Sequence, residues 1–163
     1  MRIYHLSKTA RDELVESISK ISGEHQFKSK ELKAAEADDP NFVMVFDETE
    51  KIFLGKKNES NYFPLLKDEL ILPKLPSVTV DSGAVKFICN GANVMRPGIT
   101  KIDGEFNTND LLVVKEEKYG KMIAVGTAII TSNEMRSTAK GPVITNLHYV
   151  GDKFWEMLKG IHA

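Results

Sequence analysis

The chain has 163 residues, which is enough for one sizeable domain or two small ones. Hydrophobic residues make up 42% and charged residues 28%, as in an ordinary soluble globular protein. The formal net charge of −1 argues against a protein that coats nucleic acid through bulk charge, although it allows a local basic patch. No apolar run approaches the length of a membrane span, and the N-terminus lacks the apolar core of a secretory signal, so we expect a cytoplasmic protein.

Residues that could carry catalysis or bind a metal are sparse. Cys89 is the only cysteine, which excludes an internal disulfide and a multi-cysteine metal site. The four histidines are dispersed, so we expect neither a metal nor a cofactor. The sequence has no phosphate-binding glycine loop, no G-x-S-x-G elbow and no H-E-x-x-H motif. The carboxylate pairs at 38–39 and 116–117 lie in polar, loop-like sequence, which indicates a solvated surface and a protein that is not an enzyme.

The first half of the chain predicts a small domain of mixed structure. We expect a strand at 3–6 and then a helix that Ser7 or Thr9 caps and Gly23 ends. Its apolar face comprises Ala10, Leu14, Ile18 and Ile21. The Lys/Glu/Ala-rich stretch 28–37 predicts a short exposed helix, and 42–54 predicts a β-hairpin. A final apolar segment, 62–72, has partly helical spacing.

The second half is rich in strands. Pro73 and Pro76 favour extended backbone and mark the expected boundary between a domain at 1–76 and one at 77–163. Two strands, 110–114 and 122–130, are joined by a turn at Tyr119-Gly120. One face of the second strand has small residues, which suits a small closed barrel. The remaining elements are a helical turn from 131, a strand at 141–150 and a last helix that Asp152 caps.

The stretch 80–98 is the most informative part of the sequence. It predicts a helix capped by Asp81 or Ser82, with Ala84, Phe87 and Ile88 on one apolar face that Val85 and Cys89 widen. We expect Cys89 to be a buried, unreactive thiol. Gly91 is placed to take the left-handed conformation that ends a helix. Gly98 follows Pro97 in a turn that lets the backbone approach another molecule closely.

The order of these motifs resembles a PUA domain, a small RNA-binding pseudobarrel. The matching segments are 80–84, 91–99, Asp110, 124–128 and 140–143. The tail 146–155 resembles the end of the malignant T-cell-amplified-sequence proteins and their archaeal relatives, in which a pre-PUA domain comes first. Residues 62–66 and 71–73 resemble the junction of the two domains. The resemblance implies an α+β fold, with a small α/β pre-PUA domain at 1–76. A PUA-type β pseudobarrel with short helices and a C-terminal helix would occupy 77–163.

The resemblance also implies a function. PUA domains bind structured RNA, often a stem beside a single-stranded end such as the tRNA acceptor. The two-domain members, together with ligatin, act in translation initiation on the small ribosomal subunit, where the density-regulated protein is a partner. The implied RNA-binding residues are Lys86, Gly91, Ala92, Asn93, Met95, Arg96, Pro97, Gly98, Lys101, Arg136 and Lys140. Met95 and Pro97 would cover a terminal base, since shape and stacking dominate RNA readout.

Two other functions stay open at this point. The protein could be an accessory factor for tRNA or rRNA modification, because PUA domains are often attached to modifying enzymes. The N-terminal part is too small for their catalytic domain. It could instead be a protein-interaction adaptor that uses the basic residues Lys28, Lys30 and Lys33 with the aromatic residues Tyr62 and Phe63.

Overall fold

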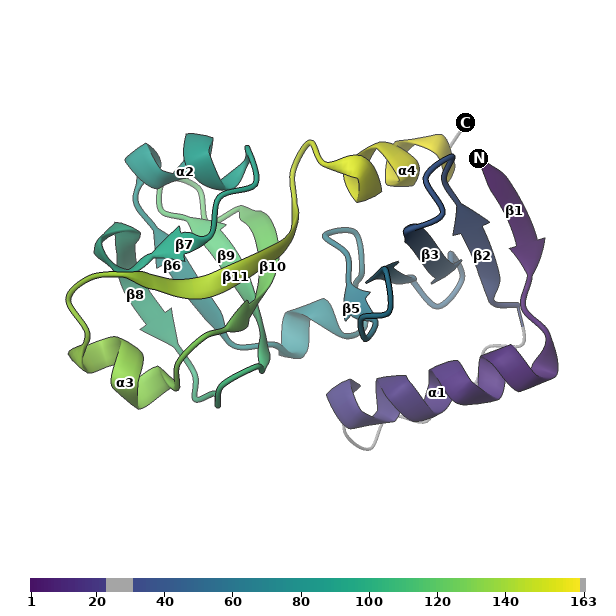
Figure 1. Ribbon diagram of the computed structural model, residues 1–163, viewed down its shortest axis with the longest axis horizontal. Coiled ribbons are helices and arrows are strands. Elements are labelled where there is room, and N and C mark those ends of the chain that lie inside the picture. The colour runs from purple at the N-terminus through teal and green to yellow at the C-terminus, as the bar shows by residue number, and fades with distance from the viewer. Residues whose placement is uncertain (23–30, 162–163) are drawn as a thin grey trace. The chain divides into compact units, whose positions relative to one another are not determined.

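The computed structural model, which describes residues 1–22 and 31–161, has two compact units (Figure 1). The first comprises Met1–Lys74 together with Glu156–Ala163, and the second comprises Leu75–Trp155. The domain boundaries expected from the sequence, 1–76 and 77–163, stay a prediction. No helix among the described residues is both long and apolar enough to cross a membrane.

The first unit is built on a five-stranded antiparallel sheet with the strand order β1-β2-β3-β4-β5. Its strands are β1 (Arg2–His5), β2 (Lys33–Glu36), β3 (Phe42–Asp47), β4 (Ile52–Lys57) and β5 (Phe63–Pro64). Helix α1 (Lys8–Ser22) lies alongside this sheet and buries Leu14 and Ile18. Ser7 caps the helix, because its hydroxyl accepts the Ala10 amide at 3.2 Å. The predicted end of the helix at Gly23 lies outside the described residues.

One prediction for the first unit was wrong. The stretch 28–37 was expected to be a helix, but its described part contains β2, which pairs with β1 on one side and β3 on the other. Ala34 and Ala35 are completely buried there, so pairing and burial outweigh the helix propensity of the sequence. The segment 62–72 has only the short β5 and the start of the 3₁₀ turn η1 (Leu72–Lys74).

A buried carboxylate organises the segment after β5. Asp68 accepts the backbone amides of Ile71 and Leu72 at 2.6 and 2.9 Å, and that of Phe53 on β4 at 3.0 Å. These bonds tie the loop to the sheet and hold the start of η1. Burial nevertheless raises the pKa of Asp68, and the amides act against that rise.

The second unit is built on a curled, half-barrel sheet of six strands with the order β7-β11-β10-β9-β6-β8. The pair β6–β9 is parallel and the other pairs are antiparallel. The strands are β6 (Ser77–Val80), β7 (Val94–Met95), β8 (Ile99–Asp103), β9 (Leu111–Glu116), β10 (Met122–Ala128) and β11 (Pro142–Tyr149). The small face of β10 is confirmed: Ala124 and Ala128 are each 1% exposed, and a Cβ at Gly126 would lie 2.4 Å from the Thr145 carbonyl oxygen.

Short helices connect these strands, and their caps agree with the sequence. They are α2 (Ser82–Ile88), the 3₁₀ turn η2 (Arg96–Gly98), α3 (Ser132–Ser137) and α4 (Lys153–Ile161). Thr131 and Glu134 form a reciprocal capping box on α3. The Asp152 carboxylate accepts the Trp155 amide at 2.8 Å and so caps α4. The expected α+β fold, with a β pseudobarrel and short helices after a small mixed unit, is confirmed.

Candidate functional site

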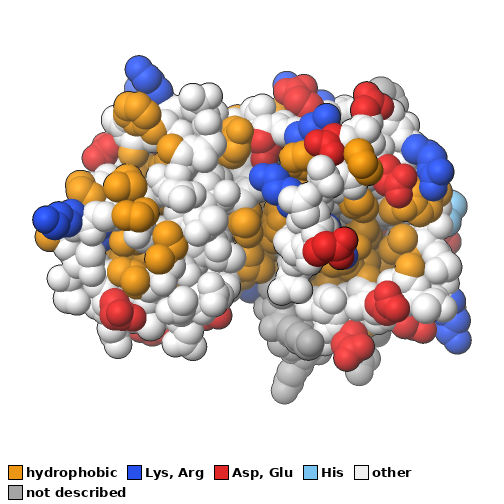
Figure 2. All heavy atoms as spheres, viewed as in Figure 1, with side chains coloured by type: hydrophobic (Ala, Val, Ile, Leu, Met, Phe, Trp, Pro, Cys, Tyr) orange, Lys and Arg blue, Asp and Glu red, His pale blue; other side chains and the backbone are white. Residues whose placement is uncertain are grey.

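A groove of about 530 Å³ opens on the second unit beside α2 and the loop that follows it. Figure 2 shows hydrophobic side chains gathered over α2 and β7 on this face. Five residues that the sequence proposed as RNA contacts line the groove: Ala92, Asn93, Met95, Pro97 and Gly98. The other lining residues are Asp81, Gly83, Ala84, Phe87, Ile88 and Pro142.

The sequence predicts the start and the end of α2 correctly. Asp81 is the N-cap, and its carboxylate accepts the Ala84 amide at 2.9 Å. After the helix, Gly91 has a φ of +97°, as predicted, so the chain turns sharply away from the helix axis. The Gly91 amide donates to the Ile88 carbonyl at 3.0 Å and the Ala92 amide to the Phe87 carbonyl at 3.0 Å. These two bonds fix the loop that forms one wall of the groove.

Asn146 on β11 supports this loop from below. Its Nδ2 donates to the carbonyls of Ile88 and Ala92, each at 3.0 Å, and its backbone amide donates to Asn93 Oδ1 at 3.0 Å. The Oδ1 atom of Asn93 is therefore already used inside the protein. Asn93 lines the groove, but its side chain holds the loop to the sheet.

The 3₁₀ turn η2 forms the opposite wall. The Gly98 carbonyl accepts the Asp81 amide at 2.9 Å, which ties the turn to the start of α2. A Cβ at Gly98 would lie 3.2 Å from the Cβ of Ala84, so glycine allows the turn and the helix to approach closely. This close approach at Gly98 is thus made within the protein.

Phe87 is the main residue at which the sequence interpretation was wrong. It was placed on the buried face of α2, but it is 60% exposed, whereas Ile88 is 2% exposed. The stripe that faces the core consists of Ala84, Val85, Ile88 and Cys89. Because successive residues are separated by about 100° around a helix, Phe87 is rotated away from that stripe. A helical wheel centred on Val85 and Ile88 is the signal that would have placed Phe87 at the surface.

The groove therefore presents two large apolar side chains to solvent. Met95 is 50% exposed beside Phe87. The Lys86 Nζ lies 5.7 Å from the centroid of the Phe87 ring, a cation–π arrangement at the edge of the groove. Cys89 is half-buried, and burial raises the pKa of its thiol, which fits the unreactive role expected for it.

The Arg96 side chain does not line the groove and bonds to backbone carbonyls of the protein instead. Its Nε donates to the Met135 carbonyl on α3 at 2.7 Å, and its NH1 donates to the Ile99 carbonyl at 3.1 Å. The guanidinium thus links η2 to α3. This position fits a structural role, and an RNA contact by Arg96 stays a prediction.

The other basic residues named from the sequence lie outside the groove lining. Lys101 forms an ion pair with Asp103 at 3.4 Å. Arg136 on α3 donates to the Glu105 carboxylate at 3.0 Å and to the Gly104 carbonyl at 2.9 Å. Lys140 is exposed in the loop before β11. The groove itself therefore combines mostly apolar side chains and main chain with the polar side chains of Asp81 and Asn93, and Lys86 is the cation beside it.

Comparisons with known proteins agree with this architecture. Residues 76–150 match the family model described as the PUA domain. An uncharacterized protein of Methanocaldococcus jannaschii is 41% identical over 121 residues, which cover 69% of this chain and 74% of that protein. This chain belongs to the PUA-domain protein family. The PUA match thus contains the whole groove lining.

Two further relatives extend the comparison. Translation machinery-associated protein 20 of Schizosaccharomyces pombe is 32% identical over 103 residues, covering 58% of this chain and 57% of that protein. The match thus spans little more than half of that relative. A crystal structure of a hypothetical protein from Pyrococcus horikoshii has a TM-score of 0.76 and 32% identity, covering 96% of this chain and 99% of that one. Both units of the fold therefore occur together in a solved archaeal protein.

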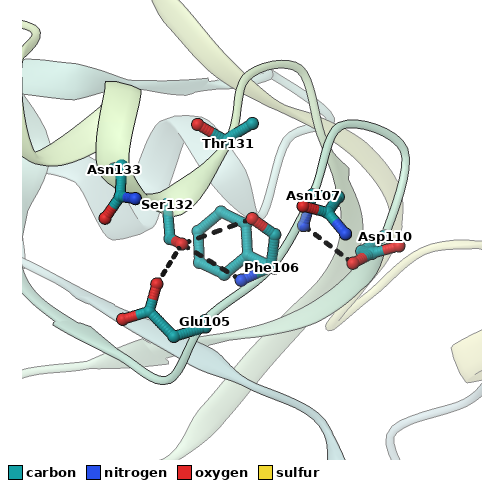
Figure 3. A pocket seen from close by; sticks show the side chains of 7 residues that line it. All are labelled: Glu105, Phe106, Asn107, Asp110, Thr131, Ser132 and Asn133. Carbon is teal, nitrogen blue, oxygen red and sulfur yellow. Dashed lines mark hydrogen bonds between the residues drawn. The ribbon is translucent and has the colours of Figure 1, made fainter.

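A second, polar pocket of about 250 Å³ lies in the PUA domain beside α3 (Figure 3). The Ser132 hydroxyl donates to Glu105 at 2.8 Å and accepts the Phe106 amide at 3.1 Å. The backbone amide of Asn107 donates to the Asp110 carboxylate at 2.8 Å. These bonds hold the 104–110 loop against α3, the helix to which Arg96 is tied. The pocket's polar groups therefore serve to place α3.

The described histidines and acids offer no metal centre. Across residues 1–22 and 31–161, no group of three His, Cys, Asp or Glu side chains could hold a metal ion. His148 is completely buried, and its Nδ1 lies 2.9 Å from the Asp152 carboxylate. Its ring also meets Phe154 edge-on at 5.8 Å. His148 thus packs and hydrogen-bonds inside the protein, while His25 and His162 lie outside the described residues.

Proposed function

We propose that this protein is a non-catalytic RNA-binding protein of the translation machinery and that RNA binds along α2 and the loop that follows it. The observation that carries the proposal is the solvent-open apolar groove with Phe87 and Met95 at its surface. A flat aromatic ring and a flexible thioether beside tightly turned main chain suit an unstacked base next to its sugar and phosphate. The family membership and the relative named for the translation machinery both support an RNA-binding role in translation.

The ligand that we propose is structured RNA with an accessible single-stranded end, either tRNA or the RNA of the small ribosomal subunit. Among the residues that line the groove only Asp81 is charged, and its carboxylate caps α2, whereas Lys86 is the cation at the groove's edge. Affinity should therefore come largely from stacking and shape, with a shallow dependence on salt. We further propose that residues 1–76 are a pre-PUA domain and that the protein acts in the cytoplasm.

The adaptor function has less support than RNA binding. Phe63 is 1% exposed, and Tyr62 is half-buried with Lys56 Nζ 5.4 Å from its ring centroid. Lys33 lies half-buried in β2, and Lys28 and Lys30 lie outside the described residues. The aromatic and basic residues that suggested a protein-binding surface do not form an exposed apolar patch in the described part of the first unit.

Binding to purified small ribosomal subunits, to tRNA and to tRNA lacking its 3′ end would test the proposal across a salt series. The double variant Phe87→Ala/Met95→Ala should weaken binding of the preferred RNA by about 5- to 150-fold, as expected for loss of one stacked base. Ile129→Ala is the matched control, because Ile129 is an exposed apolar residue of the same unit outside the groove. Equal affinity of the double variant and the wild type would refute the groove as the RNA site, and no binding to any of the three RNAs would refute the function.

A further inference from the structure

The turn between β9 and β10, residues 117–121, presents the most exposed large hydrophobic side chain among the described residues. Tyr119 at its tip is 71% exposed, more than Phe87 in the groove. The Lys118 Nζ lies 5.2 Å from the centroid of the Tyr119 ring, and Lys121 is exposed on the other side of Gly120. A tyrosine that only completed the fold would be expected to bury more of its ring.

The backbone of this turn is held firmly although its tip is in solvent. The Glu116 carboxylate accepts three backbone amides, those of Lys118 at 2.7 Å, Tyr119 at 2.8 Å and Lys121 at 2.9 Å. These bonds, that of Lys121 first, lower the pKa of Glu116, so its carboxylate stays charged and bonded at neutral pH. Tyr119 is thus presented on a preorganised turn, which reduces the entropy lost when a ligand binds.

The acidic side chains of the turn bond to the protein, whereas its lysines are exposed to solvent. Both acidic side chains point to amides of the protein: Glu116 bonds within the turn, and Glu117 Oε1 accepts the Ser82 amide at 3.0 Å. The cations Lys118 and Lys121 remain exposed. The tip therefore offers positive charge on either side of an aromatic ring, which is the combination that single-stranded RNA requires for phosphates and a base.

The turn also lies next to the groove. The Glu117 amide donates to the Val80 carbonyl at 3.0 Å, and its side chain reaches Ser82, the first residue of α2. The neighbouring residues Gly83 and Ala84 line the groove. Helix α2 has seven residues and is about 10 Å long, so RNA on the groove can extend past the helix start to the turn.

We propose that the turn 117–121 is a second RNA contact of the PUA domain, in which Tyr119 stacks on an unpaired base and Lys118 and Lys121 bind phosphates. This inference rests on the RNA-binding function proposed above. It assigns to the RNA a path from the groove, along the start of α2, to the β9–β10 turn.

The test is a titration of the full-length protein with fluorescently labelled unfractionated tRNA and with purified small ribosomal subunits. Tyr119→Ala should weaken binding of the preferred RNA by about 5- to 150-fold, while Tyr119→Phe should keep wild-type affinity because only the ring stacks. Lys118→Gln/Lys121→Gln should reduce the slope of log affinity against log salt by about 1.4 to 1.8, the value for two phosphate contacts. The charge-matched control is Lys8→Gln/Lys74→Gln, two exposed lysines of the first unit.

A direct readout separates contact from indirect effects. In Tyr119→Trp the introduced indole should be quenched when RNA binds, measured against the wild type, whose only tryptophan is Trp155. If the wild type binds RNA and the Phe87→Ala/Met95→Ala variant is weakened, but Tyr119→Ala and the lysine variant are unchanged, the second contact is refuted and the proposed function stands. If the wild type binds neither RNA, both are refuted.

Discussion

The hydrogen bonds of Arg96 lead to a sharp prediction about its role. Arg96→Ala should act mainly on stability, because the guanidinium donates to two backbone carbonyls, at 2.7 and 3.1 Å. The Met135 carbonyl belongs to a completely buried residue of α3, so the substitution leaves an acceptor with reduced access to water.

The magnitude follows from these bonds. A hydrogen bond to a charged group contributes about 1.5 to 3 kcal/mol. Because Arg96 is only half-buried, water can replace part of what is lost, and we expect a total decrease of about 2 to 3 kcal/mol in the free energy of unfolding. For a domain of this size the midpoint temperature should fall by about 10 to 20 °C. Arg96→Lys should recover little, since an ammonium group lacks the planar fork that reaches both carbonyls.

Urea denaturation followed by the fluorescence of Trp155 measures this change. Lys101→Ala is the control: its ion pair with Asp103 is exposed, so stability should change by less than about 0.5 kcal/mol. An Arg96→Ala protein with wild-type stability and much weaker RNA binding would refute the structural role and show that the guanidinium serves the ligand.

Two further predictions concern the groove's surroundings. Asp81→Ala should cost about 1 kcal/mol of stability by removing the α2 cap, while Asp81→Asn should cost much less; equal losses in urea titrations would contradict the capping role. Glu116 has a lowered pKa in the folded protein, so its contribution is present above its unfolded pKa and is lost as pH falls through the folded value. Glu116→Gln should therefore flatten the acid side of the curve of stability against pH, and an unchanged curve would show that the three amides do not depend on its charge.

The sequence predicted local structure best where one residue determines it. Asp81, Thr131 and Asp152 cap helices, and Gly91 takes a positive φ, because each signal acts within three or four residues. The predictions failed where distant partners decide. The strand β2 exists because β1 and β3 flank it, and the parallel pair β6–β9 joins segments more than thirty residues apart.

The sequence predicted where the site lies more accurately than which side chains face it. Loop 91–98 does form a wall of the groove, but the exposure of Phe87 depends on which stripe of a seven-residue helix faces the sheet. Periodicity over two turns fits more than one such stripe. The sequence placed Tyr119 in a turn but did not single it out as a contact. Only the structure shows that its ring is exposed and that Glu116 holds the turn in place.

The residues that carry the family resemblance mostly bond to the protein itself. Asp81 caps α2, Asn93 and Asn146 join the loop to β11, and Arg96 holds η2 to α3. The resemblance therefore predicts the shape of the groove, because these bonds build it. The exposed side chains that we propose as ligand contacts, Phe87, Met95 and Tyr119, make few of these bonds and are free to differ without loss of the fold. Which RNA is bound should accordingly depend on those three side chains, and exchanging them for other aromatic or aliphatic residues should change RNA preference while leaving stability nearly unchanged.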